Sequence, residues 1–354
     1  LTSVKKVIPL FIFDEHILDK LPKDDARVTF IHEELEKIYS TLQEKYGASL
    51  LVKHGNPLEI FREIISKINI TAVYTNHDYE TYAITRDQKV KELLETQNIT
   101  FHTFKDQVIF ERDEIVKADG KPYSIYTPYS KRWLARLKHS DYESVDCASH
   151  YKNLSKIHFD FPSLKDIGFT ASSVKVLPHT MTENIIENYE ATRNFPAIEG
   201  TSKLSPHLRF GTISVRQCVQ NGLQSEENTF LKELIWREFF MQILWHFPKS
   251  VTNNFKSKYD AIKWRTNEEE FKAWCEGRTG YPLVDAGMRE LNESGYMHNR
   301  VRMITASFLC KHLLIDWKWG EAYFAEKLLD FDLAQNVGNW QWVAGTGCDS
   351  APYF

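Results

Sequence analysis

Four segments in the second half of the sequence combine charged, hydroxyl, amide and aromatic side chains at spacings that could do chemistry. The first, GTSKLSPHLRFG at 200–211, places hydroxyl side chains and Lys203 directly after a glycine. Its backbone N–H groups, hydroxyls and cation could together bind phosphate oxygens. The same pattern is typical of an ordinary helix N-cap in a Gly/Ser turn, so the segment alone leaves both interpretations open.

The second segment, ELIWREFF at 233–240, is typical of a helix. Side chains spaced i, i+3, i+4 and i+7 share one helix face, which here would carry Glu233, Trp236, Arg237 and Phe240. A helix that only filled a core would seldom place an acid and a guanidinium on its aromatic stripe. We therefore expect this face to line a ligand site.

The third segment, GYMHNRVRM at 295–303, is also helix-like. The helical period places Asn299, Arg302 and Met303 on a common face and points Arg300 elsewhere. An amide, a guanidinium and a thioether on one face again predict a binding surface.

The fourth segment, DFDLAQNVGNWQW at 330–342, contains two acids two residues apart, asparagine, and two tryptophans two residues apart. A buried carboxylate needs a partner, because an unpaired buried charge is costly. Arg302 is the natural partner for Asp330 or Asp332, and the sequence does not decide between them.

Tryptophan is concentrated in the same half: eight of the nine lie from Trp236 to Trp342. A single tryptophan is more often core filling than a functional group. Their concentration in one region favours an aromatic ligand, a stacking site or an electron path.

The part of the sequence that precedes these segments alternates between strand-like and helix-like stretches. Short apolar runs predict strands at 7–13, 49–52, 70–74 and 99–104. Helical spacing predicts helices at 24–46, 58–68 after Pro57, and 83–96. Repeated β-α-β units with short connections predict a parallel, doubly wound sheet.

From residue 182 onward the apolar spacing is helical, and no comparable strand-like alternation follows. Residues 126–181 lack steady periodicity and predict a surface connector. We therefore predict an α/β N-terminal domain over 1–125, a connector over 126–181, and an all-helical C-terminal domain over 182–354.

Composition excludes several classes of protein. With 42% hydrophobic and 26% charged residues, the chain is typical of a folded, soluble protein. Its longest apolar run, 7–13, is far shorter than the roughly 20 residues of a membrane helix, and no secretory signal opens it. The five cysteines are scattered, with neither a C-x-x-C pair nor an H-E-x-x-H motif. We expect a cytoplasmic protein with no membrane contact and no metal site.

Together, GTSKLSPHLRFG, ELIWREFF, GRTGYPLVDAGMRELNESGYMHNRVRM and LLDFDLAQNVGNWQW resemble the photolyase/cryptochrome family, most closely its class I cyclobutane pyrimidine dimer photolyases. The resemblance covers essentially the whole chain and implies a monomeric enzyme that uses light and FAD to repair pyrimidine dimers in DNA. The alternative is a cryptochrome-type blue-light photoreceptor without repair activity. Asn336 favours the enzyme, because plant and animal cryptochromes usually carry Asp or Cys there, and Met303 disfavours a (6–4) photolyase, which would carry His.

The resemblance assigns a set of residues to FAD: Tyr189, Thr201, Ser202, Lys203, Leu204, Ser205, Phe230, Arg237, Asn299, Arg302, Asp330, Asp332 and Asn336. Asn336 would face flavin N5, where a neutral amide can accept a hydrogen bond from the N5–H group without adding negative charge. The charge of Arg302 would stabilise the anionic reduced flavin.

The resemblance also implies a dimer flipped out of the duplex into a pocket. Five residues would contact this substrate or the DNA: Glu233, Trp236, Arg300, Met303 and Trp342. An electron-transfer chain would run from Trp340, nearest the flavin, through Trp317 to Trp264 at the surface. Together with Glu233 and Asn336, these tryptophans complete the predicted catalytic set.

Two further expectations concern the N-terminal half and the chain ends. A second, antenna chromophore is expected in this family, but Tyr82 and Ala83 stand where folate-binding members tend to have an Asn-Glu pair. A deazaflavin, another flavin or an empty site all stay open. Compared with the family pattern, we expect the first strand and the C-terminal end to be missing.

Overall fold

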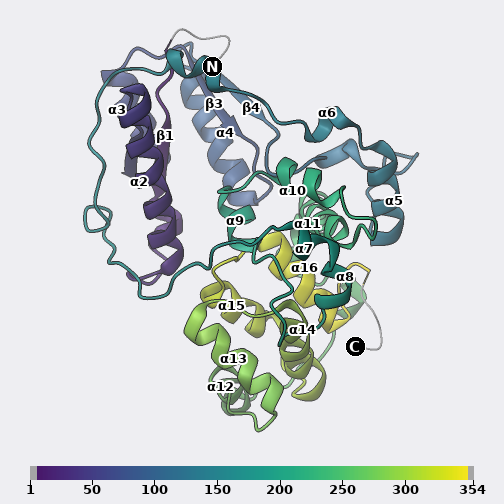
Figure 1. The fold of residues 1–354 in the computed structure, drawn as a ribbon. Helices are drawn as coiled ribbons and strands as arrows, with labels where there is room; N and C mark the ends of the chain where they lie inside the picture. Colours follow the sequence, from purple (N-terminus) through teal and green to yellow (C-terminus); the bar gives the residue numbers. More distant parts are fainter. Residues whose placement is uncertain (1–5, 350–354) are drawn as a thin grey trace. The chain divides into compact units, whose positions relative to one another are not determined.

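The computed structural model describes residues 6–349, which form two compact units (Figure 1). Unit 1 holds the residues up to Asn76, Tyr82–Phe104 and Ser144–Val176. Unit 2 holds His77–Thr81, Lys105–Glu143 and the residues from Leu177 onward. Among the described residues, no helix has the length and apolarity needed to cross a bilayer.

Unit 1 has the expected α/β architecture, in which strands and helices alternate along the chain. Its elements are β1 (Leu10–Asp14), α1 (Glu15–Leu18), α2 (Ala26–Tyr46), β2 (Leu51–Gly55), α3 (Pro57–Lys67), β3 (Ala72–Asn76), α4 (Thr81–Glu95), β4 (Thr100–Phe104) and the 3₁₀ turn Ala148–Asn153. The strands pair in parallel, β1 with β2 and β3 with β4. The described residues thus form two parallel pairs rather than one continuous ladder.

The strands begin about where the apolar runs predict, with shifts that have local causes. The first expected strand starts at Leu10 rather than at residue 7, because Pro9 has no N–H to give to a ladder. Pro57 opens α3 as expected, and the Asn56 side chain caps it by accepting from the Leu58 N–H.

Unit 2 is helical throughout. Its helices are α5 (Tyr126–Arg136), α6 (His139–Tyr142), α7 (Glu183–Glu187), α8 (Tyr189–Thr192), α9 (Ser205–Phe210), α10 (Val215–Gly222), α11 (Thr229–His246), α12 (Glu268–Cys275), α13 (Pro282–Ser294), α14 (Asn299–Ser307), α15 (Trp317–Lys327) and α16 (Leu333–Ala344). Short 3₁₀ turns lie at Arg112–Glu114, Pro248–Val251 and Ser257–Tyr259, and a π-helical turn lies at Phe308–His312. Helix α11 is buried along most of its length, and its apolar side chains are spread around nearly all sides of the helix.

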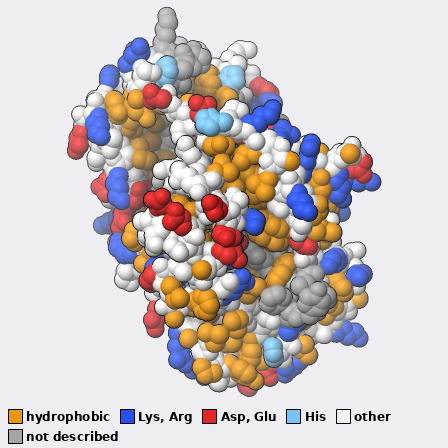
Figure 2. Space-filling model, turned by 45° about the vertical axis from the view of Figure 1, so that its right-hand side comes forward, with side chains coloured by type: hydrophobic (Ala, Val, Ile, Leu, Met, Phe, Trp, Pro, Cys, Tyr) orange, Lys and Arg blue, Asp and Glu red, His pale blue; other side chains and the backbone are white. Residues whose placement is uncertain are grey.

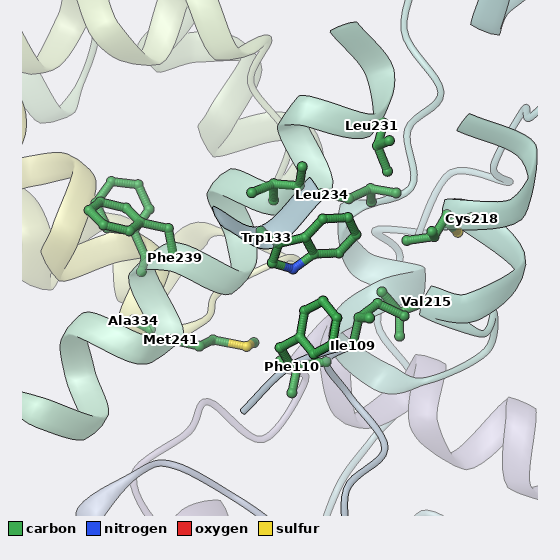
Figure 3. Packing of buried hydrophobic residues seen from close by; sticks show 14 of the residues in the cluster. Ile109, Phe110, Trp133, Val215, Cys218, Leu231, Leu234, Phe239, Met241 and Ala334 are labelled. Carbon is green, nitrogen blue, oxygen red and sulfur yellow. The ribbon is translucent and has the colours of Figure 1, made fainter. Parts of the chain in front are cut away.

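The expected surface connector over 126–181 is wrong for its first part, which forms the buried helix α5. Tyr129 and Trp133 are fully buried, and Figure 3 shows Trp133 packed beside Phe110 and Leu234. The expected limits 1–125, 126–181 and 182–354 therefore do not coincide with the two units. The helical periodicity of so short a segment was too weak to predict α5 from the sequence.

A buried carboxylate, Glu238 of α11, explains why residues 105–136 pack with the helical unit. It accepts from the backbone N–H groups of Ile109 and Phe110 at 2.7 and 3.0 Å, and from the Trp133 indole at 2.5 Å. Burial raises the pKa of Glu238 to about 7, and these donors oppose that rise. One acid thereby joins three segments distant in sequence.

Candidate functional site

An ion pair between α14 and the segment before α16 shows whether Asp330 or Asp332 is the partner of Arg302. Arg302 donates to both carboxylate oxygens of Asp330, at 3.1 and 2.8 Å. The Ser205 hydroxyl donates to the same carboxylate at 2.5 Å. Burial alone would lower the pKa of Arg302, but Asp330 raises it above its ordinary value. The structure thus holds a permanently charged guanidinium in a fixed orientation.

Asp332, the other candidate partner, has a different environment. Its side chain caps α16 by accepting from the Gln335 N–H at 3.0 Å, and Arg209 lies 3.5 Å away. Arg209 also donates to Glu80 at 3.1 Å. This acid therefore stabilises the start of the helix that carries the last motif.

The amide of Asn336 is oriented by a neighbour that the sequence did not single out. Its Nδ2 group donates to both the backbone oxygen and the carboxylate of Glu321 on α15, at 2.9 and 2.8 Å. Both amide hydrogens are thereby used, which leaves Oδ1 as the acceptor for a ligand. Burial raises the pKa of Glu321, so this carboxyl is easier to protonate than a surface one.

The segment 200–211 forms a short loop that enters α9 at Ser205. Ser202 and Leu204 are buried, and Lys203 has the left-handed backbone φ of 52°. The Lys203 ammonium lies 2.6 Å from the Glu199 carboxylate. The cation expected to contact phosphate is therefore partly neutralised by a neighbouring acid.

The face of α11 predicted to be one site contacts two different regions. Glu233 pairs with Arg193, and Trp236 stacks on Tyr126 with ring centroids 3.6 Å apart. Farther along, Arg237 donates to the Gln107 backbone oxygen at 2.6 Å. Phe240 is buried against α16, close enough to Gly338 that a β-carbon there would collide with the ring.

Arg300 does not point away from the face shared by Asn299, Arg302 and Met303, contrary to the expectation. Its guanidinium reaches the sulfur of Met303 at 3.0 Å and the side-chain oxygen of Asn194 at 2.7 Å. A residue at i and one at i+3 are neighbours on a helix surface, and the long arginine side chain spans that spacing. Asn299, by contrast, is exposed, with its amide 4.0 Å from Met303.

Two other members of the predicted cofactor set lie together. The rings of Tyr189 and Phe230 meet edge to face, with centroids 5.5 Å apart. Arg193 lies over the ring of Tyr189, 5.6 Å from its centroid. Since Arg193 also pairs with Glu233, these aromatic residues adjoin the acid predicted to read the substrate.

The predicted electron-chain tryptophans share one hydrophobic cluster. Trp340 and Trp317 are buried and Trp264 is partly exposed, with Trp342 half-buried at the cluster's margin. The ring of Trp340 contacts Trp274, with centroids 6.1 Å apart. Burial distinguishes Trp264 from the other two but does not order Trp340 and Trp317, so the electron path stays a prediction, and Trp274 is an additional neighbour.

Several residues that touch the predicted ones were not expected from the sequence, among them Tyr126, Arg193, Trp274 and Glu321. Arg193 and Trp274 carry a visible signal, since a cation and an indole lie near the motifs. Tyr126 and Glu321 carry none, because only tertiary packing places them against Trp236 and Asn336.

In unit 1, the position weighed for an antenna chromophore holds an aromatic stack. The Tyr82 hydroxyl donates to Asp14 at 2.7 Å, and its ring stacks on His16 with centroids 4.4 Å apart. This arrangement differs chemically from an Asn-Glu pair, because the tyrosine hydroxyl is already used as a donor.

Fold and site define a class: a protein with an α/β half and a helical half, in which unit 2 holds a fixed guanidinium, an oriented amide and a tryptophan cluster. A family model described as the FAD binding domain of DNA photolyase matches residues 230–354, and one described as DNA photolyase matches residues 1–147. The chain belongs to the DNA photolyase family.

Individual relatives agree with this assignment. A deoxyribodipyrimidine photo-lyase of Halobacterium salinarum is 36% identical over 374 residues, which cover 98% of this chain and 76% of the relative. A bacterial class III photolyase structure from Agrobacterium tumefaciens has a TM-score of 0.84 at 34% identity, covering 98% of this chain and 76% of that one. An archaeal photolyase from Sulfolobus tokodaii, solved with two FAD molecules, also scores 0.84 at 33% identity, covering 100% and 80%.

Proposed function

We propose that this protein is a deoxyribodipyrimidine photo-lyase, which splits cyclobutane pyrimidine dimers in DNA with light absorbed by reduced FAD. The observation that carries the proposal is the fixed orientation of Asn336, whose amide hydrogens are both held by Glu321. A neutral acceptor at this position suits the N–H of a reduced flavin. Membership of the photolyase family indicates the reaction, and the oriented Asn336 amide is suited to the reduced flavin that this reaction uses.

The residues present fit FAD by the chemistry of their donors. Thr201, Ser202 and Ser205 offer hydroxyls, and Lys203 offers a cation for the phosphates. Arg302 offers a positive charge that Asp330 holds in place. When bound, reduced FAD supplies the electron that opens the dimer. The remaining proposed contacts are Tyr189, Leu204, Phe230, Arg237, Asn299, Asp332 and Asn336.

The dimer itself would be bound next to this site. Glu233 would accept hydrogen bonds from a base edge, and Trp236 and Trp342 would stack against the bases; such stacking contributes about 1–3 kcal/mol per base. Met303 would pack beside the dimer. Arg300, which lies against Met303, would contact a phosphate.

Arg193 has a place in the same proposal. It neutralises Glu233 while DNA is absent, and its charge is available to the phosphates of a bound strand. Lys and Arg side chains are scattered among hydrophobic ones on the face shown in Figure 2. Since the net charge is −4, a local contact of this kind suits the molecule better than a broad basic surface.

The proposed working unit is one chain, because every residue assigned to FAD or to the dimer belongs to unit 2 of the same chain. Light-dependent loss of thymine dimers from an oligonucleotide tests the function, with anaerobically reduced protein, a dark control and the Glu233→Ala variant. Protein that binds FAD and dimer-containing DNA but removes no dimers in light would refute the repair activity. It would then favour a photoreceptor.

A further inference from the structure

One buried histidine caps the helix that carries both the proposed flavin contact and the proposed DNA contact. His298 immediately precedes α14 and is 7% exposed. Its Nδ1 accepts a hydrogen bond from the Arg300 backbone N–H at 3.2 Å. Helix caps are usually Ser, Thr, Asp or Asn, so a histidine in this position brings a proton-binding group to the start of the helix.

The hydrogen bond determines the protonation state of the ring. An Nδ1 atom that accepts cannot carry a proton, so the imidazole is neutral with its hydrogen on Nε2. Nε2 is buried and has no hydrogen-bond partner among residues 6–349. A second proton would therefore break the cap and gain no new acceptor in return.

The charges around His298 also oppose protonation. Burial, Arg300 and Arg302 lower its pKa. Glu290 on α13 is the nearby acid, and its carboxylate accepts from the His298 backbone N–H. Asp330 compensates the charge of Arg302 directly, through the bidentate pair.

We propose that neutral His298 is a positioning residue that holds the first turn of α14 so that Arg302 and Asn299 meet FAD and Arg300 meets DNA. The proposal rests on the proposed function, because it assumes that α14 lines the flavin site. His298 itself touches neither ligand in this account. It acts through the backbone of Arg300.

The histidine cap should make the stability of the folded protein depend on pH in a specific way. The pKa of His298 is lower in the folded protein than in the unfolded chain, where it is about 6.5. Its contribution to stability is therefore fully present above about pH 6.5 and is lost as the pH falls toward the folded-state pKa. An asparagine can cap the same helix but does not titrate.

The test compares wild type with His298→Asn and His298→Ala, using FAD affinity and thermal unfolding from pH 5 to 8. His102→Asn, an exposed histidine on β4, is the matched control. At pH 7.5 we expect His298→Ala to bind FAD about fivefold more weakly, as expected for the loss of a cap. His298→Asn should bind within about twofold of wild type.

The pH profile separates capping from simple packing. Wild type and His102→Asn should lose thermal stability and FAD affinity below about pH 6.5, whereas His298→Asn should lose clearly less of both. If His298→Asn follows the wild-type profile, the cap proposal is wrong. If His298→Ala changes unfolding but leaves FAD affinity intact, the positioning role is wrong. Wild type that binds no FAD at any pH would refute the proposed function, while the unfolding profiles would still test the cap.

Discussion

Replacing Asn336 by aspartate should turn an amide–carboxylate hydrogen bond into a pair of competing carboxyl groups. The Asn336 amide nitrogen lies 2.8 Å from the Glu321 carboxylate, so Asn336→Asp places an oxygen there instead. At that distance and an effective dielectric constant near 20, two unit charges repel by about 6 kcal/mol. Both groups cannot stay ionised, so the pair should hold one proton between them.

This shared proton should be visible in the pH dependence of stability. Burial already raises the pKa of Glu321, and a second carboxyl group raises it further. When the pKa of a carboxyl group is raised in the folded state, the group's contribution to stability is fully present below its unfolded-state pKa of about 4.3. That contribution is lost as the pH rises through the folded-state pKa. A rise of about three pKa units would cost about 4 kcal/mol at high pH.

Urea unfolding of wild type and Asn336→Asp at several values between pH 5 and 9 measures this difference directly. We expect the variant to approach wild-type stability at pH 5 and to lose stability steadily toward pH 9. The double variant Asn336→Asp with Glu321→Gln lacks the second acid and should lose most of the pH dependence. A constant difference between variant and wild type over the whole range would show that the two groups do not share a proton.

Three further predictions test other parts of the site. Trp340→Phe should slow photoreduction of bound flavin but leave dimer repair by chemically reduced protein nearly unchanged; loss of repair would place Trp340 in the reaction itself. Glu233→Ala should weaken binding to dimer-containing DNA about tenfold, as for a lost charged hydrogen bond, at constant FAD content. The Glu233→Ala variant should bind undamaged DNA at least as tightly as wild type, because Arg193 is released from its ion pair. A variant that purifies colourless would contradict the expected constant FAD content. Glu238→Gln should lower the free energy of unfolding in urea by about 3 kcal/mol, since an amide hydrogen would face the N–H groups of Ile109 and Phe110, and a loss below about 1 kcal/mol would contradict the anchoring role.

The local patterns of the sequence were enough for the class of fold and for the chemistry of the motifs. Apolar runs of strand length separated by helical spacing predicted the α/β half, and each predicted strand overlaps an observed one. Long motifs with Asn336 and Arg302 predicted the family and its cofactor. These features are readable because helical and strand periods act over neighbouring residues.

The sequence could not show which of those faces meet. Asp330 rather than Asp332 pairs with Arg302, and Glu321 rather than any motif residue orients Asn336. Helix α5 is buried because Trp133 donates to Glu238, a residue 105 positions away. Periodicity determines the side of an element on which a residue lies, but the partner on that side depends on how elements distant in the chain pack. That choice is made by burial and by the requirement that buried polar groups find partners, and only the tertiary structure contains it.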